Sequence, residues 1–221
     1  MNRSLKMQLA LVIISAATCQ LSALGRHSQE ADRQTVVIYV YDLAGVSSRT
    51  LNQATEGAGR ILASAGVEAV WQVGPADASE AHACDMRVTS HGTSSRRPAS
   101  RDHLVLRLVR DYPEWSLPGA LGYSLPDARF GVHATVFYDR METVSRTGDV
   151  SLSTMLGHAI AHEIGHVLLG TIDHSPSGIM KARWETADYR QAEMGLMKFT
   201  AREGEAIRKR AAVQISVRDQ R

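Results

Sequence analysis

The chain has 221 residues, of which 44% are hydrophobic and 22% are charged, and its net charge is +2 at neutral pH. A chain of this length can bury a substantial core but is short for two ordinary domains, so one globular domain is expected. The basic C-terminal stretch RKRAAVQISVRDQR has too few clustered charges for nucleic-acid binding and fits a solvated helix face. No nucleic-acid partner is therefore expected.

Residues 1–25 have the pattern of a secretory signal peptide. Arg3 and Lys6 precede the apolar run MQLALVIISAA, and small residues follow it. The run is too short to cross a bilayer comfortably, so no stable membrane span is expected. Cleavage near Gly25 would leave residues 26–221 as a single mature domain.

A lipid anchor at Cys19 is the alternative to a cleaved signal peptide. The residues before this cysteine, AAT, match the usual lipobox poorly, so the cleaved signal is the favoured interpretation. In both cases the mature protein is expected outside the cytoplasm, secreted or periplasmic.

The first half of the mature chain predicts a strand, a helix and a second strand. Residues Thr35–Tyr41 are β-branched and aromatic, residues 47–65 have a helical pattern closed by Gly66, and Val67–Val73 alternates as a strand. A strand–helix–strand connection of this kind predicts parallel strands.

The middle of the chain predicts a long loop followed by short strands. Residues 74–100 are rich in Gly, Pro, Ser and Arg and predict a loop with a short strand around Met86–Val88. Three further strands are predicted at Leu104–Val109, Ala120–Ser124 and Ala134–Tyr138.

The run SLSTMLGHAIAHEIGHVLL predicts an apolar helix. Ser151 and Ser153 are both possible N-caps, apolar residues recur at helical spacing, and Gly170 marks the end. Within this helix His162 and His166 lie four residues apart and therefore on one face, where they can direct two imidazoles at one metal ion. A zinc ion held by neutral imidazoles makes a bound water more acidic, and Glu163 can accept the proton.

The segment HEIGHVLLGTIDHSPSGIM resembles the metzincin clan of zinc metallopeptidases, whose signature is HExxHxxGxxH followed by a turn that contains a methionine. The resemblance implies one catalytic Zn2+ held by His162, His166 and His174. It also implies that Glu163 is the general base and Met180 the methionine of the Met-turn.

The same resemblance implies an α+β fold. Its N-terminal part would be α/β-like, with a twisted mixed sheet and two main helices, and the zinc-binding helix would be followed by the Met-turn and a C-terminal helix. The last helix is predicted at Thr186–Met197 or from Thr200 to Val213, where TARE forms a capping box. Leu121–Ser124 would be an edge strand that pairs with an extended peptide.

The spacing to the third ligand departs from the family pattern. The glycine and the third ligand usually follow the second histidine by three and six residues, but here Gly170 and His174 follow by four and eight. Asp173 and Glu185 therefore remain alternative third ligands.

Two other candidate groups have simpler interpretations. His158 shares the helix face, but three histidines spanning eight residues of a helix extend over about 12 Å and cannot all bind one ion, so His158 is expected to pack or support a ligand. Cys84 has no expected disulfide partner, and its surroundings AHACDMR do not match the family's cysteine switch, so a buried thiol is expected.

These observations favour a zinc metalloendopeptidase with a peptide or protein substrate. A non-catalytic module braced by zinc is the alternative, but structural zinc sites commonly have four protein ligands, and here there are three candidates and no CxxC. A carbohydrate or lipid hydrolase has no positive support, because aromatic residues make up only 5% of the chain. The sequence does not indicate an oligomeric state.

Overall fold

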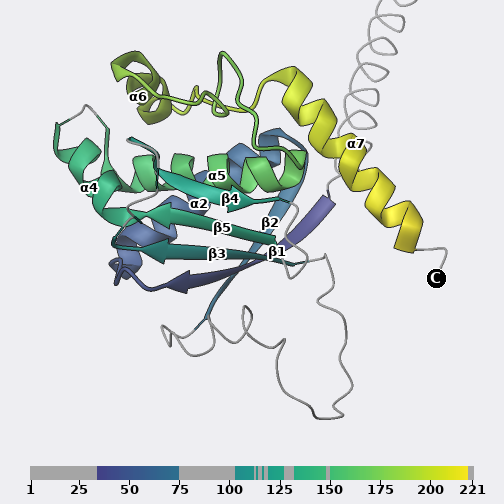
Figure 1. Ribbon diagram of the computed structural model, residues 1–221, viewed down its shortest axis with the longest axis horizontal. Helices are drawn as coiled ribbons and strands as arrows, with labels where there is room; N and C mark the ends of the chain where they lie inside the picture. The colour runs from purple at the N-terminus through teal and green to yellow at the C-terminus, as the bar shows by residue number, and fades with distance from the viewer. Residues whose placement is uncertain are drawn as a thin grey trace, which may run out of the picture. The chain divides into compact units, whose positions relative to one another are not determined.

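The computed structural model describes residues 34–74, 103–111, 113, 116, 119–126, 132–147 and 150–218 (Figure 1). The predicted signal peptide, Cys19, Cys84 and the short strand around Met86–Val88 lie outside the described residues. Among the described residues, no helix is both long and apolar enough to cross a membrane.

The core of the fold is a mixed sheet of five strands in the order β2-β1-β3-β5-β4 (Figure 1). Strands β2, β1, β3 and β5 run parallel, and β4 pairs antiparallel with β5. The predicted parallel strand–helix–strand unit is therefore confirmed, and β4 lies at one edge of the sheet, as predicted. The strands are β1 (Gln34–Asp42), β2 (Val67–Val73), β3 (His103–Val109), β4 (Gly122–Leu125) and β5 (Val132–Phe137).

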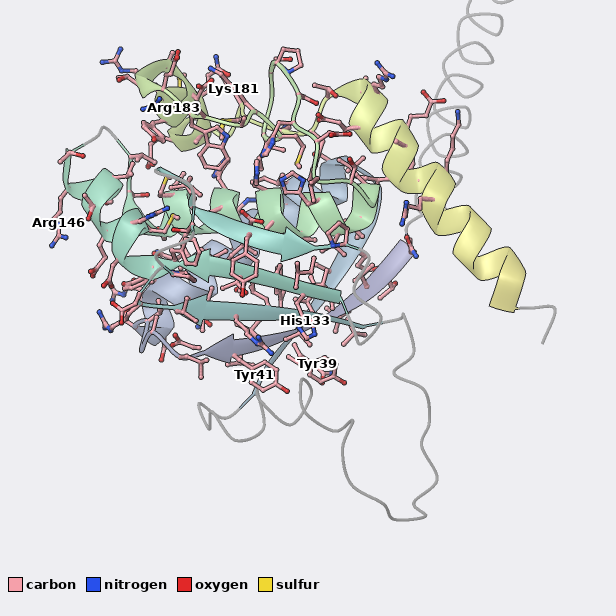
Figure 2. The ribbon with its side chains drawn as sticks, viewed as in Figure 1. Tyr39, Tyr41, His133, Arg146, Lys181 and Arg183 are labelled. Atoms are coloured by element: carbon pink, nitrogen blue, oxygen red, sulfur yellow. The ribbon has the colours of Figure 1, made fainter. Side chains whose placement is uncertain are left out.

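The two faces of the sheet have different side chains because successive strand residues point to opposite faces. Ile38 and Val40 on β1 are fully buried in the hydrophobic core. The alternate residues Tyr39 and Tyr41 belong to the other face, and Figure 2 shows them near His133, well away from the labelled Lys181 and Arg183.

Two long helices pack together on the core face of the sheet. The N-cap of helix α2 (Ser48–Ser64) is Ser47, whose hydroxyl accepts a hydrogen bond from the Thr50 backbone N–H. Helix α5 (Leu152–Leu169) crosses it so closely that a Cβ on Gly157 would lie 2.7 Å from the Ala54 carbonyl oxygen. The glycine permits this approach, which fixes the helix that carries the histidines.

Helix α4 (Tyr138–Thr147) was not predicted, and the predicted strand Ala134–Tyr138 is wrong at its end. Strand β5 ends at Phe137, and Tyr138 begins the helix. Only Tyr138 and Met141 of this helix are buried, so its apolar pattern is too sparse to indicate a helix. The Arg140 side chain connects helix α4 to the segment before β4 by donating hydrogen bonds to the Ala120 carbonyl oxygen and the Ser116 hydroxyl.

The two positions that were alternatives for the last helix each form one, α6 (Thr186–Glu193) and α7 (Ala201–Arg218). Helix α6 is shorter than the predicted Thr186–Met197, because Gly195 follows it with a positive φ of 69°. The capping box at α7 is confirmed: the Thr200 N–H donates to the Glu203 carboxylate at 2.7 Å, and the Glu203 N–H donates to the Thr200 hydroxyl. With five strands and five helices in its described part, the chain has the predicted α+β fold.

Candidate metal centre

Helix α5 holds the two histidines of the HExxH segment at fixed positions. Its N-cap is Ser151, whose hydroxyl accepts a hydrogen bond from the Thr154 N–H. Of the two predicted N-caps, Ser151 and Ser153, the first is therefore the one observed. Its C-cap is Gly170 in the left-handed conformation (φ 65°), as predicted, and the Gly170 N–H donates to the His166 carbonyl oxygen at 2.8 Å. A glycine adopts this conformation without strain, and it turns the chain back toward the helix.

Three histidines converge where this turn returns to α5. His162, His166 and His174 each offer a ring nitrogen, and these atoms lie within 4.8 Å of one another. The Nε2 atoms of His162 and His166 are 3.1 Å apart. The His174 ring lies 5.4 Å from the His162 ring and 4.8 Å from the His166 ring, measured between centroids.

The hydrogen bonds of two rings show which nitrogens are free to bind a cation. The Nδ1 atom of His162 lies 2.7 Å from the Ile179 carbonyl oxygen, and that of His166 lies 3.0 Å from the Thr171 carbonyl oxygen. A carbonyl oxygen only accepts, so both Nδ1 atoms carry the proton and both Nε2 atoms of the neutral rings present lone pairs.

This donor set fits one zinc ion. Two nitrogen lone pairs that face each other at 3.1 Å repel, unless a cation lies between them. Two tetrahedral zinc ligands at roughly 2.0–2.1 Å from the metal would be about 3.3 Å apart, close to the distance observed. The predicted zinc cofactor is therefore consistent with the geometry of the site.

Burial lowers the pKa of all three imidazoles, although His174 is the most exposed of them. It lowers the pKa of His162 to about 3, with further lowering from the neighbouring His166 and His174. Burial also lowers the pKa of His166 and of His174. Because protons compete with zinc for the same nitrogens, lowered pKa values extend zinc binding toward acidic pH.

The structure brings His174 to the site but not its two alternatives. The Asp173 carboxylate accepts a hydrogen bond from the Thr171 hydroxyl at 2.8 Å. Glu185 is exposed, is the N-cap residue of α6 and lies 3.7 Å from the Lys181 ammonium. Although the loop between Gly170 and His174 is longer than in the family pattern, it still brings His174 next to His162 and His166. Zinc binding by His174 stays a prediction.

Met180 packs on helix α5 at Gly165, a residue that lies between His162 and His166 in the sequence. A Cβ on Gly165 would lie 2.6 Å from the Met180 sulfur, so the sulfur packs directly on the helix backbone. The turn is held by the Ser175 N–H, which donates to the Met180 carbonyl oxygen, and by the Ile179 N–H, which donates to the Lys198 carbonyl oxygen. The metzincin resemblance implied that Met180 is the methionine of the Met-turn, and that role stays a prediction.

Glu163 lies under the edge strand β4 and is only 4% exposed. Its carboxylate oxygen Oε2 and its carbonyl oxygen each lie 2.7 Å from the Ser124 hydroxyl. A Cβ on Gly122 would lie 2.9 Å from the Glu163 side chain, so the strand fits closely over it. Burial raises the pKa of Glu163 to about 7, and the hydrogen bond from Ser124 opposes that rise.

His158 is separate from the group of three, as predicted. Its Nδ1 atom lies 2.8 Å from the Thr154 carbonyl oxygen of its own helix, and its ring packs at 90° on Trp184 with 6.4 Å between centroids. Sequence reasoning missed Ser124, Trp184 and the two carbonyls that orient the histidines. No local pattern marks them, because their contacts join segments far apart in the chain.

The described fold therefore brings together the three histidines that the sequence predicted as metal ligands. No family model and no curated protein matches the sequence.

The solved structures that are similar to this chain include three metal-dependent peptidases. Archaemetzincin from Methanopyrus kandleri matches with 14% identity and a TM-score of 0.46, over 82% of this chain and 97% of the other. A zinc-dependent peptidase from Methanocorpusculum labreanum matches with 16% identity and a TM-score of 0.47, over 77% and 99%. Metalloproteinase-II from Bacteroides fragilis matches with 11% identity and a TM-score of 0.46, over 80% and 53%. Because these identities and TM-scores are low, the function proposed below rests on the chemistry of the site.

Proposed function

We propose that this protein is a zinc-dependent endopeptidase that acts outside the cytoplasm. One observation carries the proposal: three imidazoles converge, and the carboxylate of Glu163, next to His162 in the chain, is buried under the edge strand of the sheet. A metal site of this kind combines a cation, a proton acceptor and a surface for an extended chain, which are the parts that peptide hydrolysis needs.

His162, His166 and His174 would hold the zinc ion. When bound, zinc supplies a Lewis acid that makes water more acidic and stabilises negative charge on a carbonyl oxygen. Three protein ligands leave one coordination position open, whereas a structural zinc site normally fills four. The group of three therefore favours catalysis over a structural brace.

Glu163 would move the proton. Its carboxylate accepts a proton from the attacking water and gives it to the amine that leaves when the peptide bond breaks. A group does this best when its pKa is near the working pH, and in the metal-free protein burial raises the pKa of Glu163 to about 7. The Ser124 hydroxyl holds the carboxylate in place during both transfers.

Strand β4 would bind the substrate backbone. Within the described part of the chain, no strand pairs with the side of β4 that faces away from β5. An extended peptide can satisfy such an edge by adding a strand, and Gly122 and Ser124 would then bring it beside Glu163. Recognition through backbone groups suits a peptidase that accepts the middle of a chain.

The proposed location rests on the sequence alone. Two basic residues followed by an apolar run and small residues support export through a signal peptide cleaved near Gly25. N-terminal sequencing of the protein recovered from the culture medium or periplasm tests this. A mature form that still begins at Met1 would contradict export with cleavage.

Substitution of Glu163 tests the proposed activity. Zinc-loaded wild-type protein is expected to cleave a peptide library, whereas Glu163→Gln should keep its zinc and lose at least about 100-fold in rate, the range expected for loss of a general base. Glu56→Gln on α2 is the matched control, because the Glu56 carboxylate is exposed and forms an ion pair with Arg60 of the same helix. Zinc-loaded wild type that cleaves nothing would support the structural brace instead.

A further inference from the structure

The Ile179 carbonyl oxygen accepts two hydrogen bonds from different parts of the metal centre. The His162 Nδ1–H donates to it at 2.7 Å, and the Trp184 indole Nε1–H donates to it at 3.2 Å. A carbonyl oxygen has two lone pairs, so both are used. The N–H of Ile179 donates in turn to the Lys198 carbonyl oxygen at 2.9 Å. The Ile179 backbone is therefore fixed at both its amide and its carbonyl.

The indole ring of Trp184 also contacts His162 directly. Its centroid lies 5.7 Å from that of the His162 ring at an angle of 82°, which is an edge-to-face contact. Trp184 is 7% exposed, so the contact is shielded from water. The His162 ring is thus held at one nitrogen by a carbonyl and on its side by an indole.

We infer that Trp184 is a positioning residue of the metal centre. Its N–H fixes the direction of the Ile179 carbonyl, which keeps the proton of His162 on Nδ1 and directs Nε2 toward the other histidines. Trp184 cannot bind the metal itself, because an indole N–H only donates. The inference rests on the proposed role of His162 as a zinc ligand.

His166 gives an internal comparison. Its Nδ1–H donates to the Thr171 carbonyl oxygen at 3.0 Å, and Trp184 takes no part in that bond. If Trp184 acts through the Ile179 carbonyl, its loss should disturb His162 and leave His166 unchanged. A general loosening of the fold would disturb both rings.

Zinc affinity of Trp184→Phe, measured by competition with a chelator, is the first test. Phenylalanine keeps an aromatic ring but removes the N–H. Loss of the group that hydrogen-bonds to a metal-binding histidine weakens metal binding about 10- to 100-fold. Trp184 acts on His162 through the Ile179 carbonyl, so a loss of zinc affinity of about tenfold, at the lower end of that range, is expected. Trp71→Phe is the control, because Trp71 lies on β2 at the opposite edge of the sheet from β4. Unchanged affinity in Trp184→Phe would overturn the inference.

Nitrogen-15 NMR of the histidine rings in metal-free protein is the second test. In the wild type, His162 should carry its proton on Nδ1 only. In Trp184→Phe, His162 should show a mixture of tautomers, whereas His166 stays as in the wild type.

A wild-type His162 protonated on Nε2 would overturn the inference without any variant, and so would equal changes in both rings of Trp184→Phe. Both tests measure binding and protonation and not hydrolysis. A negative result therefore leaves the proposed peptidase activity standing, and an inactive protein that passes both tests leaves the role of Trp184 standing.

Discussion

Ser124→Ala isolates the contact between the edge strand and the proposed general base. The substitution removes a hydroxyl that lies 2.7 Å from both the Glu163 carboxylate and the Glu163 carbonyl oxygen. The strand backbone and the three histidines stay in place. Because the hydroxyl donates to the carboxylate, its loss should raise the pKa of Glu163 above its present value of about 7.

The size of this shift follows from the energy of the lost bond. A hydrogen bond to a charged group contributes about 1.5–3 kcal/mol, which corresponds to about one to two pKa units. The single hydroxyl proton is shared between two acceptors, so about one unit is expected. Zinc lowers the pKa of Glu163 in both proteins, so the difference between them is the quantity to measure.

The assay is the pH profile of kcat/KM for a peptide substrate. The acidic limb should move to higher pH by about one unit in Ser124→Ala, so activity at pH values along that limb falls several-fold and recovers at higher pH. Ser124→Thr keeps a hydroxyl and is expected to stay near the wild-type profile, and zinc content should be equal in all three proteins. An unmoved acidic limb in Ser124→Ala would refute the reasoning.

Three further predictions concern zinc, packing and acid. In chelator competition, zinc affinity should fall strongly in each of the variants His162→Ala, His166→Ala and His174→Ala. The affinity of Asp173→Ala and Glu185→Ala should stay within a few fold of the wild type. A loss of affinity confined to Asp173→Ala or Glu185→Ala would refute the assignment of the three histidines as ligands. In urea denaturation, Gly165→Ala should lower the free energy of unfolding by about 1–3 kcal/mol, since the new Cβ would meet the Met180 sulfur at 2.6 Å. The control Gly57→Ala should not lower the free energy of unfolding, because the nearest contact of its Cβ would be 3.8 Å away. In metal-free protein, burial raises the pKa of Glu163 and so favours the protonated carboxyl group. The stability that this protonated group contributes is fully present below its ordinary pKa near 4.5 and is lost as pH rises to about 7. The stability of the wild type relative to Glu163→Gln should therefore fall by up to about 3 kcal/mol over that range, and a constant difference would contradict the burial of Glu163.

The sequence predicted the parts of this structure that local patterns specify. The parallel unit of β1, α2 and β2 follows from strand and helix periods, and the capping box at Thr200 marks the start of α7. The i, i+4 spacing of His162 and His166 places them on one face of any helix. These features need no knowledge of distant contacts.

The features that the sequence did not predict depend on contacts between distant segments. Ser124 meets Glu163 across 39 positions, and His162 meets the Ile179 carbonyl across 17. Helix α4 is held by Met141 in the core and by Arg140, which bonds to the segment before β4, and not by an apolar stripe. A backbone carbonyl that orients a ligand has no signal in the sequence, since every residue has one.

Crystals of the zinc-loaded protein, measured on both sides of the zinc absorption edge, test the central claim most directly. One anomalous peak is expected, bound by the Nε2 atoms of His162 and His166 and by a ring nitrogen of His174 at about 2.0–2.1 Å. One coordination position should remain open on the side of Glu163 and β4. A fourth protein ligand that closes this position, or a peak away from the three histidines, would contradict the account.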